Sequence, residues 1–356
     1  MIHSRSDKHL GNSAPISATA QAKGTAGHAP TDGRPRLGAP RSGRASLARL
    51  VFVLLLAQAV AGALSPSAAN PSQDASSVSS RECKILLKVE RFGDLAAGLR
   101  EFWSLVEAAA RQEGLTVKAN GPFPGREKTR YVAFYDTPGF DLYRRGFILR
   151  RRGETPEDVM PGRHNDHLRC DATLKFRHPE LQLEQLATIQ PDHSLKGETK
   201  VEEDVVAGPA GIRQVFSLSS KVKLKKEPTP RLAGYIKVFP GLARLNLDET
   251  LAMQPVRGTL IREYSISPGS IDLQGLTTAE TTFSVWTRPP AQRPFVVEFS
   301  FAYDLPPGGY LNHKVDRAQE TANRLLKAIQ RIGAAWIATG QTKTGLIYQI
   351  EVAHAE

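Results

Sequence analysis

The chain has 356 residues, a formal net charge of +11, 40% hydrophobic residues and two cysteines. This length exceeds one average domain and falls short of three, and the apolar content is ordinary for a globular protein with a substantial core. Two cysteines exclude a cysteine-rich zinc module and a multiply bridged scaffold. We expect Cys83 and Cys170 to be buried thiols, with a single disulfide as the alternative if the domain is exported.

The basic charge is concentrated near the N-terminus. Residues 1–50 carry eight Lys or Arg against two Asp. The high pI is therefore largely a property of this segment and is weak evidence for nucleic-acid binding. We expect no specific nucleic-acid partner.

Residues 1–48 are rich in Gly, Ala, Ser, Pro and Arg without a hydrophobic period, which predicts a disordered basic leader. Residues 49–64 follow a basic flank, are mainly apolar and end in small residues, Ala61-Gly-Ala63. This pattern is typical of a cleaved secretory signal, and an uncleaved membrane anchor is the alternative. We therefore expect a protein that is exported to the periplasm or the extracellular space, or tethered through residues 50–64. Residues 65–80 have the composition of a linker.

The folded domain is expected over residues 81–350. Alternation predicts a first strand over 84–90, and apolar residues at three- and four-residue steps predict a helix over 95–113. A turn at 136–139 and a polar loop over 154–167, which contains His164 and His167, separate the strands that follow. These strands are predicted over 131–135, 147–152, 171–177 and 198–206.

The second half of the domain also contains mainly short strands. A helix is predicted over 212–221 and another over 316–332, and Lys343 is expected in a terminal loop or strand. The remaining strands are predicted over 235–239, 243–248, 259–266, 283–286 and 295–301. Many sequential strands with few helices predict an α+β domain built on an antiparallel sheet or barrel.

Cations alternate along two of the predicted strands. Arg150 and Arg152 point to one face and Arg151 to the other, and Lys175 and Arg177 share a face of a second strand. Cations on one face of neighbouring strands repel each other unless an anion or acidic side chains lie between them. The pattern therefore predicts either a phosphate clamp, which arginine forks suit well, or a solvent-facing strand surface that is neutralised by nearby carboxylates.

The order of these motifs resembles the CYTH superfamily, the triphosphate tunnel metalloenzymes, which include thiamine triphosphatase, class IV adenylyl cyclase and inorganic triphosphatases. The resemblance covers about residues 82–350. It implies an antiparallel β-tunnel of about eight strands with flanking helices, in which basic residues hold a triphosphate and acidic residues hold Mg²⁺ or Mn²⁺. The most specific matches are Tyr135-Asp136-Thr137, Leu142, Gly146 and Leu149-Arg150-Arg151-Arg152.

The resemblance also implies roles for individual residues. Glu202 and Glu298 would be catalytic, because they hold metal or water, and Asp204 would join them as a metal ligand. The residues expected to bind phosphate are Lys88, Arg150, Arg152, Lys175, Arg177, Lys200, Arg244 and Lys343.

The chain departs from the family at its opening E-x-E-x-K motif. The aligned positions are Lys84, Leu86 and Lys88, so only the last residue matches. Glu82 and Glu90 lie on the same face but are displaced by at least one pleat repeat, about 7 Å. The late strand retains one of its two acids. Since Mg²⁺ and Mn²⁺ need oxygen ligands, an incomplete metal site is expected.

Two function classes remain open. The first is a CYTH-like protein that binds a phosphorylated or polyanionic small ligand in a basic tunnel. This class includes a divergent metal-dependent enzyme that hydrolyses triphosphate or polyphosphate. The second is a non-catalytic binding or structural protein that retains the tunnel fold. A third interpretation is a surface polyanion binder acting through the lysines of residues 221–226.

Overall fold

The computed structural model describes residues 78–160, 168–208, 211–306, 313–338 and 341–349. The predicted leader, the signal-like run, most of the linker, and His164 and His167 lie outside these ranges. Within the ranges, no helix has the length and apolar character that a membrane span requires.

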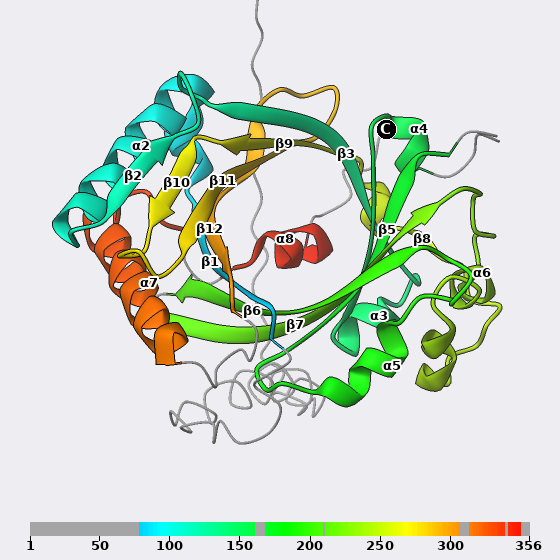
Figure 1. The fold of residues 1–356 in the computed structure, drawn as a ribbon. Helices are drawn as coiled ribbons and strands as arrows, with labels where there is room; N and C mark the ends of the chain where they lie inside the picture. Colours follow the sequence, from blue (N-terminus) through cyan, green and yellow to red (C-terminus); the bar gives the residue numbers. More distant parts are fainter. Residues whose placement is uncertain (1–77, 161–167, 209–210, 307–312, 339–340, 350–356) are drawn as a thin grey trace, which may run out of the picture. The chain divides into compact units, whose positions relative to one another are not determined.

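Nine strands close into a barrel (Figure 1). Their order is β12-β1-β6-β7-β5-β4-β3-β9-β11, and β11 pairs with β12 to complete the ring. The α+β barrel with flanking helices is confirmed, although the sheet is mixed because β1 and β6 run parallel. The strands are β1 (Ser80–Leu87), β3 (Arg126–Asp136), β4 (Phe147–Gly153), β5 (Cys170–His178), β6 (Gly197–Gly208), β7 (Gly211–Leu224), β9 (Ile261–Ser267), β11 (Thr278–Thr287) and β12 (Pro294–Asp304).

Three short strands extend this sheet outside the ring. β10 (Gly269–Asp272) pairs with β11, β2 (Thr116–Ala119) pairs with β10, and β8 (Gln254–Pro255) pairs with the end of β3.

Strand alternation divides the side chains between the outside of the barrel and its lumen, which is the space enclosed by the nine strands. In β1, Cys83, Ile85 and Leu87 belong to the main hydrophobic core, whereas Leu86 belongs to a separate cluster at one end of the lumen. Lys84 shares the inward face with Leu86, because residues two apart point the same way. Each strand therefore supplies both a core and a lining.

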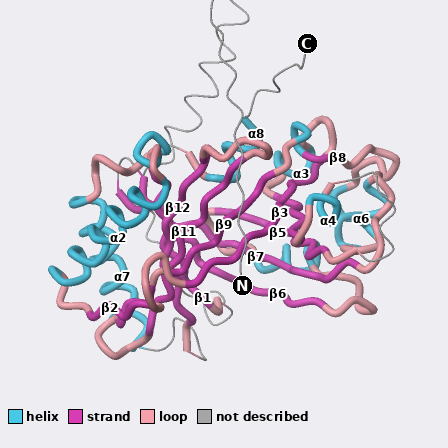
Figure 2. The backbone as a smooth tube through the Cα atoms, turned by 90° about the horizontal axis from the view of Figure 1, so that it is seen from above, coloured by secondary structure: helices cyan, strands magenta, loops and turns pink. Residues whose placement is uncertain are grey.

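Two long helices cover one flank of the barrel, α2 (Leu95–Gln112) and α7 (His313–Ile332) (Figures 1 and 2). The side chain of Asp94 caps α2 by accepting a hydrogen bond from the Ala97 amide at 3.0 Å. Phe102 on α2 packs edge-on against Phe283 and Phe299, which point outward from β11 and β12. Burial of these large aromatic faces fixes the helices against the sheet.

Shorter elements cover the opposite flank: α3 (Asp141–Arg144), α4 (Pro156–Val159), α5 (Leu186–Ile189) and α6 (Leu232–Ile236). Here Arg151 points away from the lumen and is fully buried. Cys170 is within 3.5 Å of its Nε. Cys83 and Cys170 are both buried free thiols on strands that do not pair, so the prediction of thiols rather than a disulfide is confirmed.

Several predicted elements were wrong. Residues 212–221 form part of strand β7, not a helix, because β5 and β6 provide hydrogen-bonding partners on both sides. Residues 235–239 and 243–248 were predicted as strands, but they contribute to α6 and to a 3₁₀ helix over Pro240–Leu245. Pro240 lacks a backbone donor, which favours a helical start over a strand interior.

The C-terminal segment enters the barrel. The Lys88 amide donates to the Trp336 carbonyl at 2.7 Å and the Ala338 amide donates to the Leu86 carbonyl at 2.9 Å, so the chain after α7 runs along the end of β1. Helix α8 (Lys343–Gln349), predicted as a loop or strand, then lies inside the ring of strands (Figure 1). Its Tyr348 donates to Asp136 at 3.2 Å.

Apolar side chains fill the end of the lumen around α8. Ile347 and Tyr348 belong to a buried cluster that includes Phe134 from β3, Ile148 from β4 and Trp286 from β11. This packing holds α8 in position and directs Lys343, at its start, toward the polar part of the lumen.

Candidate functional site

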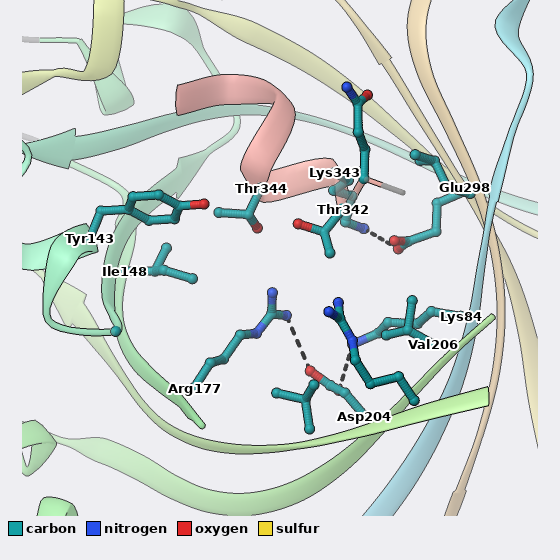
Figure 3. A pocket seen from close by; sticks show the side chains of 15 residues that line it. Lys84, Tyr143, Ile148, Arg177, Asp204, Val206, Glu298, Thr342, Lys343 and Thr344 are labelled. Atoms are coloured by element: carbon teal, nitrogen blue, oxygen red, sulfur yellow. Dashed lines mark hydrogen bonds and ion pairs between the residues drawn. The ribbon is translucent and has the colours of Figure 1, made fainter. Parts of the chain in front are cut away.

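Asp204 on β6 is the centre of one ion-pair cluster in the lumen. Its carboxylate lies 2.6 Å from the Lys84 Nζ and 3.2 Å from the Arg177 guanidinium, and it accepts a hydrogen bond from Ser217 at 2.7 Å (Figure 3). Burial by itself would raise the pKa of Asp204. The positive charges nearby, Lys84 first among them, outweigh burial, and the pKa falls well below its usual range. Four different strands meet at this carboxylate.

Glu263 on β9 is the centre of a second cluster. Arg130 and Arg152 lie 3.1 and 3.0 Å from its carboxylate, and Trp286 donates to it at 3.0 Å. Burial opposes the charge on Glu263, but the positive charges of Arg152 and other cations lower its pKa to about 2. A buried carboxylate with this many donors is a firm structural anchor.

Two further ion pairs complete the lining. Lys175 lies 3.1 Å from Glu202, and Lys343 of α8 lies 2.6 Å from Glu298. In the lumen ion pairs of the described residues, six cations share five carboxylates: Lys84, Arg130, Arg152, Lys175, Arg177 and Lys343 with Glu82, Glu202, Asp204, Glu263 and Glu298.

Arg150 is an additional lumen cation that forms no ion pair among the described residues. Its Nε is buried and has no hydrogen-bond partner there, and the same is true of the Nε atoms of Arg130 and Arg152. Burial, followed by the positive charge of Arg152, lowers the pKa of Arg150 to about 9. The guanidinium therefore stays charged at neutral pH in surroundings that disfavour its charge.

A cavity of about 300 Å³ opens between the strands and α8. Its lining includes six charged and four aliphatic side chains. Arg177 lines the cavity, and its charge is a minor cause of the lowered pKa of Arg150, which is on the same inward face of the neighbouring strand β4 but is not among the lining residues. The charged lining residues are Lys84, Arg177, Asp204, Arg213, Glu298 and Lys343, and the aliphatic ones are Leu86, Ile148, Val206 and Val215.

Three of the residues expected to bind phosphate lie apart from these clusters. Lys88 is exposed and follows the end of β1, so the strand predicted to continue to Glu90 stops three residues earlier. Lys200 is on the inward face of β6, but its half-exposed side chain pairs with Glu198 at 3.1 Å. Arg244 is exposed on the 3₁₀ helix outside the barrel.

The residues present do not fit the divalent metal that the family resemblance implies. Within the described ranges, no group of three or more His, Cys, Asp and Glu side chains is arranged to hold a metal ion. Glu202, Asp204 and Glu298 are instead each bound to Lys or Arg at 3.2 Å or less. Hard cations require free carboxylate or other oxygen ligands, and these carboxylates are already neutralised.

Arg130 and Glu263 belong to the lumen but were not among the predicted site residues. A signal for both was present: alternation places Arg130 on the face of Val132, and Glu263 is a single carboxylate two residues from the buried Ile261. A charge beside buried apolar residues on one strand face indicates a partner on a neighbouring strand.

Glu263 gives the fold a predictable acid sensitivity. Its pKa is about 2 in the folded protein, against the ordinary value of 4.5 that applies to the unfolded chain, so its stabilising contribution is complete above pH 4.5 and is lost as the pH falls toward 2. We expect the melting temperature of the wild type to fall more steeply over this range than that of Glu263→Gln, which does not titrate. Equal slopes in thermal melts of the two proteins would contradict the assignment.

Comparisons with known proteins give distant likenesses. No protein-family model matches the chain, and no curated protein matches it. Among solved structures it is similar to a "putative adenylate cyclase" from Bacillus halodurans, with 13% identity, a TM-score of 0.34, and coverage of 74% of this chain and 93% of that one. It is also similar to a "putative adenylyl cyclase" from Hippeastrum with a dominant triphosphatase activity, with 10% identity, a TM-score of 0.36, and coverage of 78% and 100%.

Proposed function

We propose that this protein binds a small polyanionic ligand, such as a phosphorylated compound, in the lumen of its barrel. The observation that carries this proposal is Arg150, a partly buried, charged guanidinium whose Nε is buried and which has no carboxylate partner among the described residues. An anion of the ligand would supply that partner. Guanidinium forks bind phosphate oxygens in pairs, which makes phosphate the best-fitting group.

The charge balance of the lumen supports the same proposal. The paired cations outnumber their carboxylates by one, Arg150 adds another positive charge, and Asp171, on the inward face of β5 opposite Arg152, supplies one negative charge. Enclosed like charges repel strongly, since the low dielectric of the interior screens them poorly. A ligand with two or more negative charges would relieve this repulsion, whereas a neutral ligand would not.

The cavity supports a small ligand. Its volume of about 300 Å³ is at the lower end of the range for small-molecule sites. Arg177 and Lys343 lie on opposite sides of the space, on β5 and α8 (Figure 3). The aliphatic side chains beside them would contact a nonpolar part of the same ligand.

We favour binding without hydrolysis. Metal-assisted attack of water on a triphosphate or polyphosphate needs a divalent cation that stabilises the developing charge. The family resemblance assigns this cation to three carboxylates. Each of them forms an ion pair with Lys or Arg instead: Glu202, Asp204 and Glu298. The non-catalytic member of the two function classes is therefore the better-supported one.

Isothermal titration calorimetry with tripolyphosphate at neutral pH tests the proposal. We expect the wild type to bind and Arg150→Ala to bind at least about tenfold more weakly, a loss of about 1.4 kcal/mol, because a charge-assisted hydrogen bond is removed. Arg100→Ala is the matched control, since Arg100 is an exposed arginine on the outer helix α2. No binding by the wild type, or equal binding by Arg150→Ala, would refute the lumen site.

A second measurement separates binding from catalysis. Release of inorganic phosphate from tripolyphosphate is followed with Mg²⁺ or Mn²⁺ present. We expect none above the background of the protein-free solution. Release that disappears in Arg150→Ala would instead establish the hydrolase alternative.

A further inference from the structure

The ammonium group of Lys84 occupies a position that is typical of a metal ion. Its Nζ lies 2.6 Å from Asp204 and 2.9 Å from Glu82, so two carboxylates converge on one point in the lumen. Lys84 itself is buried, and Figure 3 shows its side chain beside Asp204, with Glu298 on the same side of the cavity, on the neighbouring strand β12. The charge of Glu298 also acts on Lys84.

An ammonium and a divalent cation cannot occupy this point together. Oxygen ligands surround Ca²⁺ at about 2.3–2.6 Å and Mg²⁺ at about 2.0–2.1 Å, slightly closer than the two carboxylates lie to Nζ. A metal at the same point would need only a small inward movement of Asp204 and Glu82. A nearby ammonium would repel it and would compete for both carboxylates.

We propose that Lys84 is a built-in cation that takes the place of a divalent metal in the lumen and excludes metals from it. The charge needed to hold Asp204 and Glu82 together is then supplied by the chain itself. Its presence does not depend on the concentration of a divalent cation.

The protonation of Lys84 is consistent with this role. Burial opposes the charge, but the attraction of Asp204 and Glu82 outweighs it and raises the pKa of Lys84 above its usual range. The ammonium is therefore charged at neutral pH.

Binding of Mn²⁺ alone to the full-length protein tests this inference. The paramagnetic resonance signal of free Mn²⁺ falls as the ion binds, so a titration gives the affinity directly. We expect the wild type to bind Mn²⁺ at least about tenfold more weakly than Lys84→Ala, in which the two carboxylates face a vacant space. Lys84→Met provides a second neutral variant with a long unbranched side chain that carries no oxygen ligand, in case the alanine variant does not fold.

Two controls test whether the Mn²⁺ affinity depends on the ammonium between Glu82 and Asp204 or on the total positive charge of the lumen. Lys84→Arg retains the cation and should not gain Mn²⁺ affinity. Lys175→Ala also removes one positive charge from the lumen, but Lys175 pairs with Glu202 and is not held between Glu82 and Asp204. We expect it to bind Mn²⁺ no more tightly than the wild type.

Three results would overturn the inference. The first is that the wild type binds Mn²⁺ as tightly as Lys84→Ala does. The second is that neither neutral variant of Lys84 gains Mn²⁺ affinity, although circular dichroism shows that both are folded. The third is that Lys175→Ala gains as much Mn²⁺ affinity as Lys84→Ala. The comparison with the wild type requires no anionic ligand, so a failure of tripolyphosphate to bind would contradict the proposed function and leave the Mn²⁺ result standing.

A further measurement rests on the proposed function. If the wild type binds tripolyphosphate, chelation of divalent metals by EDTA should leave its affinity unchanged, because Lys84 supplies the cation. Loss of tripolyphosphate binding in EDTA would show that a metal is required and would overturn the inference.

Discussion

Asp204→Ala is expected to lower the free energy of unfolding by about 3–5 kcal/mol, the range observed when one partner of a buried ion pair is removed. The substitution leaves Lys84 and Arg177 without their shared carboxylate, and Ser217 loses its acceptor. These cations then repel each other in a space that water reaches poorly. Urea unfolding at neutral pH, followed by circular dichroism, measures the loss.

Glu202→Ala is the matched control for this prediction. Glu202 lies two residues from Asp204 on the same face of β6, but it is partly exposed, and its one ion pair within the described ranges is with Lys175. We expect a loss of about 1 kcal/mol or less, as for partly solvated pairs. If Asp204→Ala costs no more than Glu202→Ala, Asp204 is not the centre of the lumen cluster.

A polyanion should partly restore the stability of Asp204→Ala. A ligand that binds only the folded state raises the melting temperature by mass action. Tripolyphosphate should therefore raise the melting temperature of Asp204→Ala more than that of the wild type, since the variant has lost an internal anion. An equal or smaller rise would contradict an anion site next to Asp204.

Glu227→Ala is expected to lower the free energy of unfolding by about 2–3 kcal/mol. Glu227 binds the fully buried Arg151 through two hydrogen bonds, one of them from Nη2 at 2.7 Å. Removal of Glu227 leaves Arg151 with neutral partners, the Tyr135 hydroxyl at 3.3 Å and the Asp158 carbonyl at 2.8 Å. The effect is smaller than for a fully buried pair, because Glu227 is itself about one-third exposed.

Lys226→Ala is the matched control, because it removes a neighbouring charged side chain from the same part of the surface. Lys226 is the preceding residue in the chain and is exposed. Its removal should change the free energy of unfolding by less than about 0.5 kcal/mol. Urea unfolding measures both variants, and similar values for the two would show that Arg151 does not depend on its carboxylate partner.

Arg150, Arg151 and Arg152 show how far residue order predicts this protein. Strand alternation alone separates Arg151 from its two neighbours, and the structure confirms this separation: Arg151 lies in the outer core, whereas Arg152 pairs with Glu263 in the lumen. The same reasoning correctly placed Lys175 and Arg177 on one face. Alternation is local, because it depends only on the pleat of a single strand.

Local reasoning failed where a segment has two compatible structures. Residues 212–221 have spacings that fit a helix, yet they form β7 because β5 and β6 lie on either side of them. The segment around Lys343 shows the opposite case. It was expected as a loop or strand, but it forms helix α8 where Phe134 and Trp286 can cover Ile347 and Tyr348. Tertiary packing routinely outweighs intrinsic preference in such short elements.

The amino-acid sequence by itself determined the α+β class, the helices α2 and α7, and the face of each cationic strand on which its charges lie, because these follow from local periodicity. Only the tertiary structure decided which charges meet. Lys84 and Asp204 are 120 residues apart, and they form an ion pair because β1 lies parallel to β6. The order of strands around the barrel is a property of the whole chain, so it alone decides that carboxylates are neutralised by lysine and arginine while Arg150 is left without a partner among the described residues.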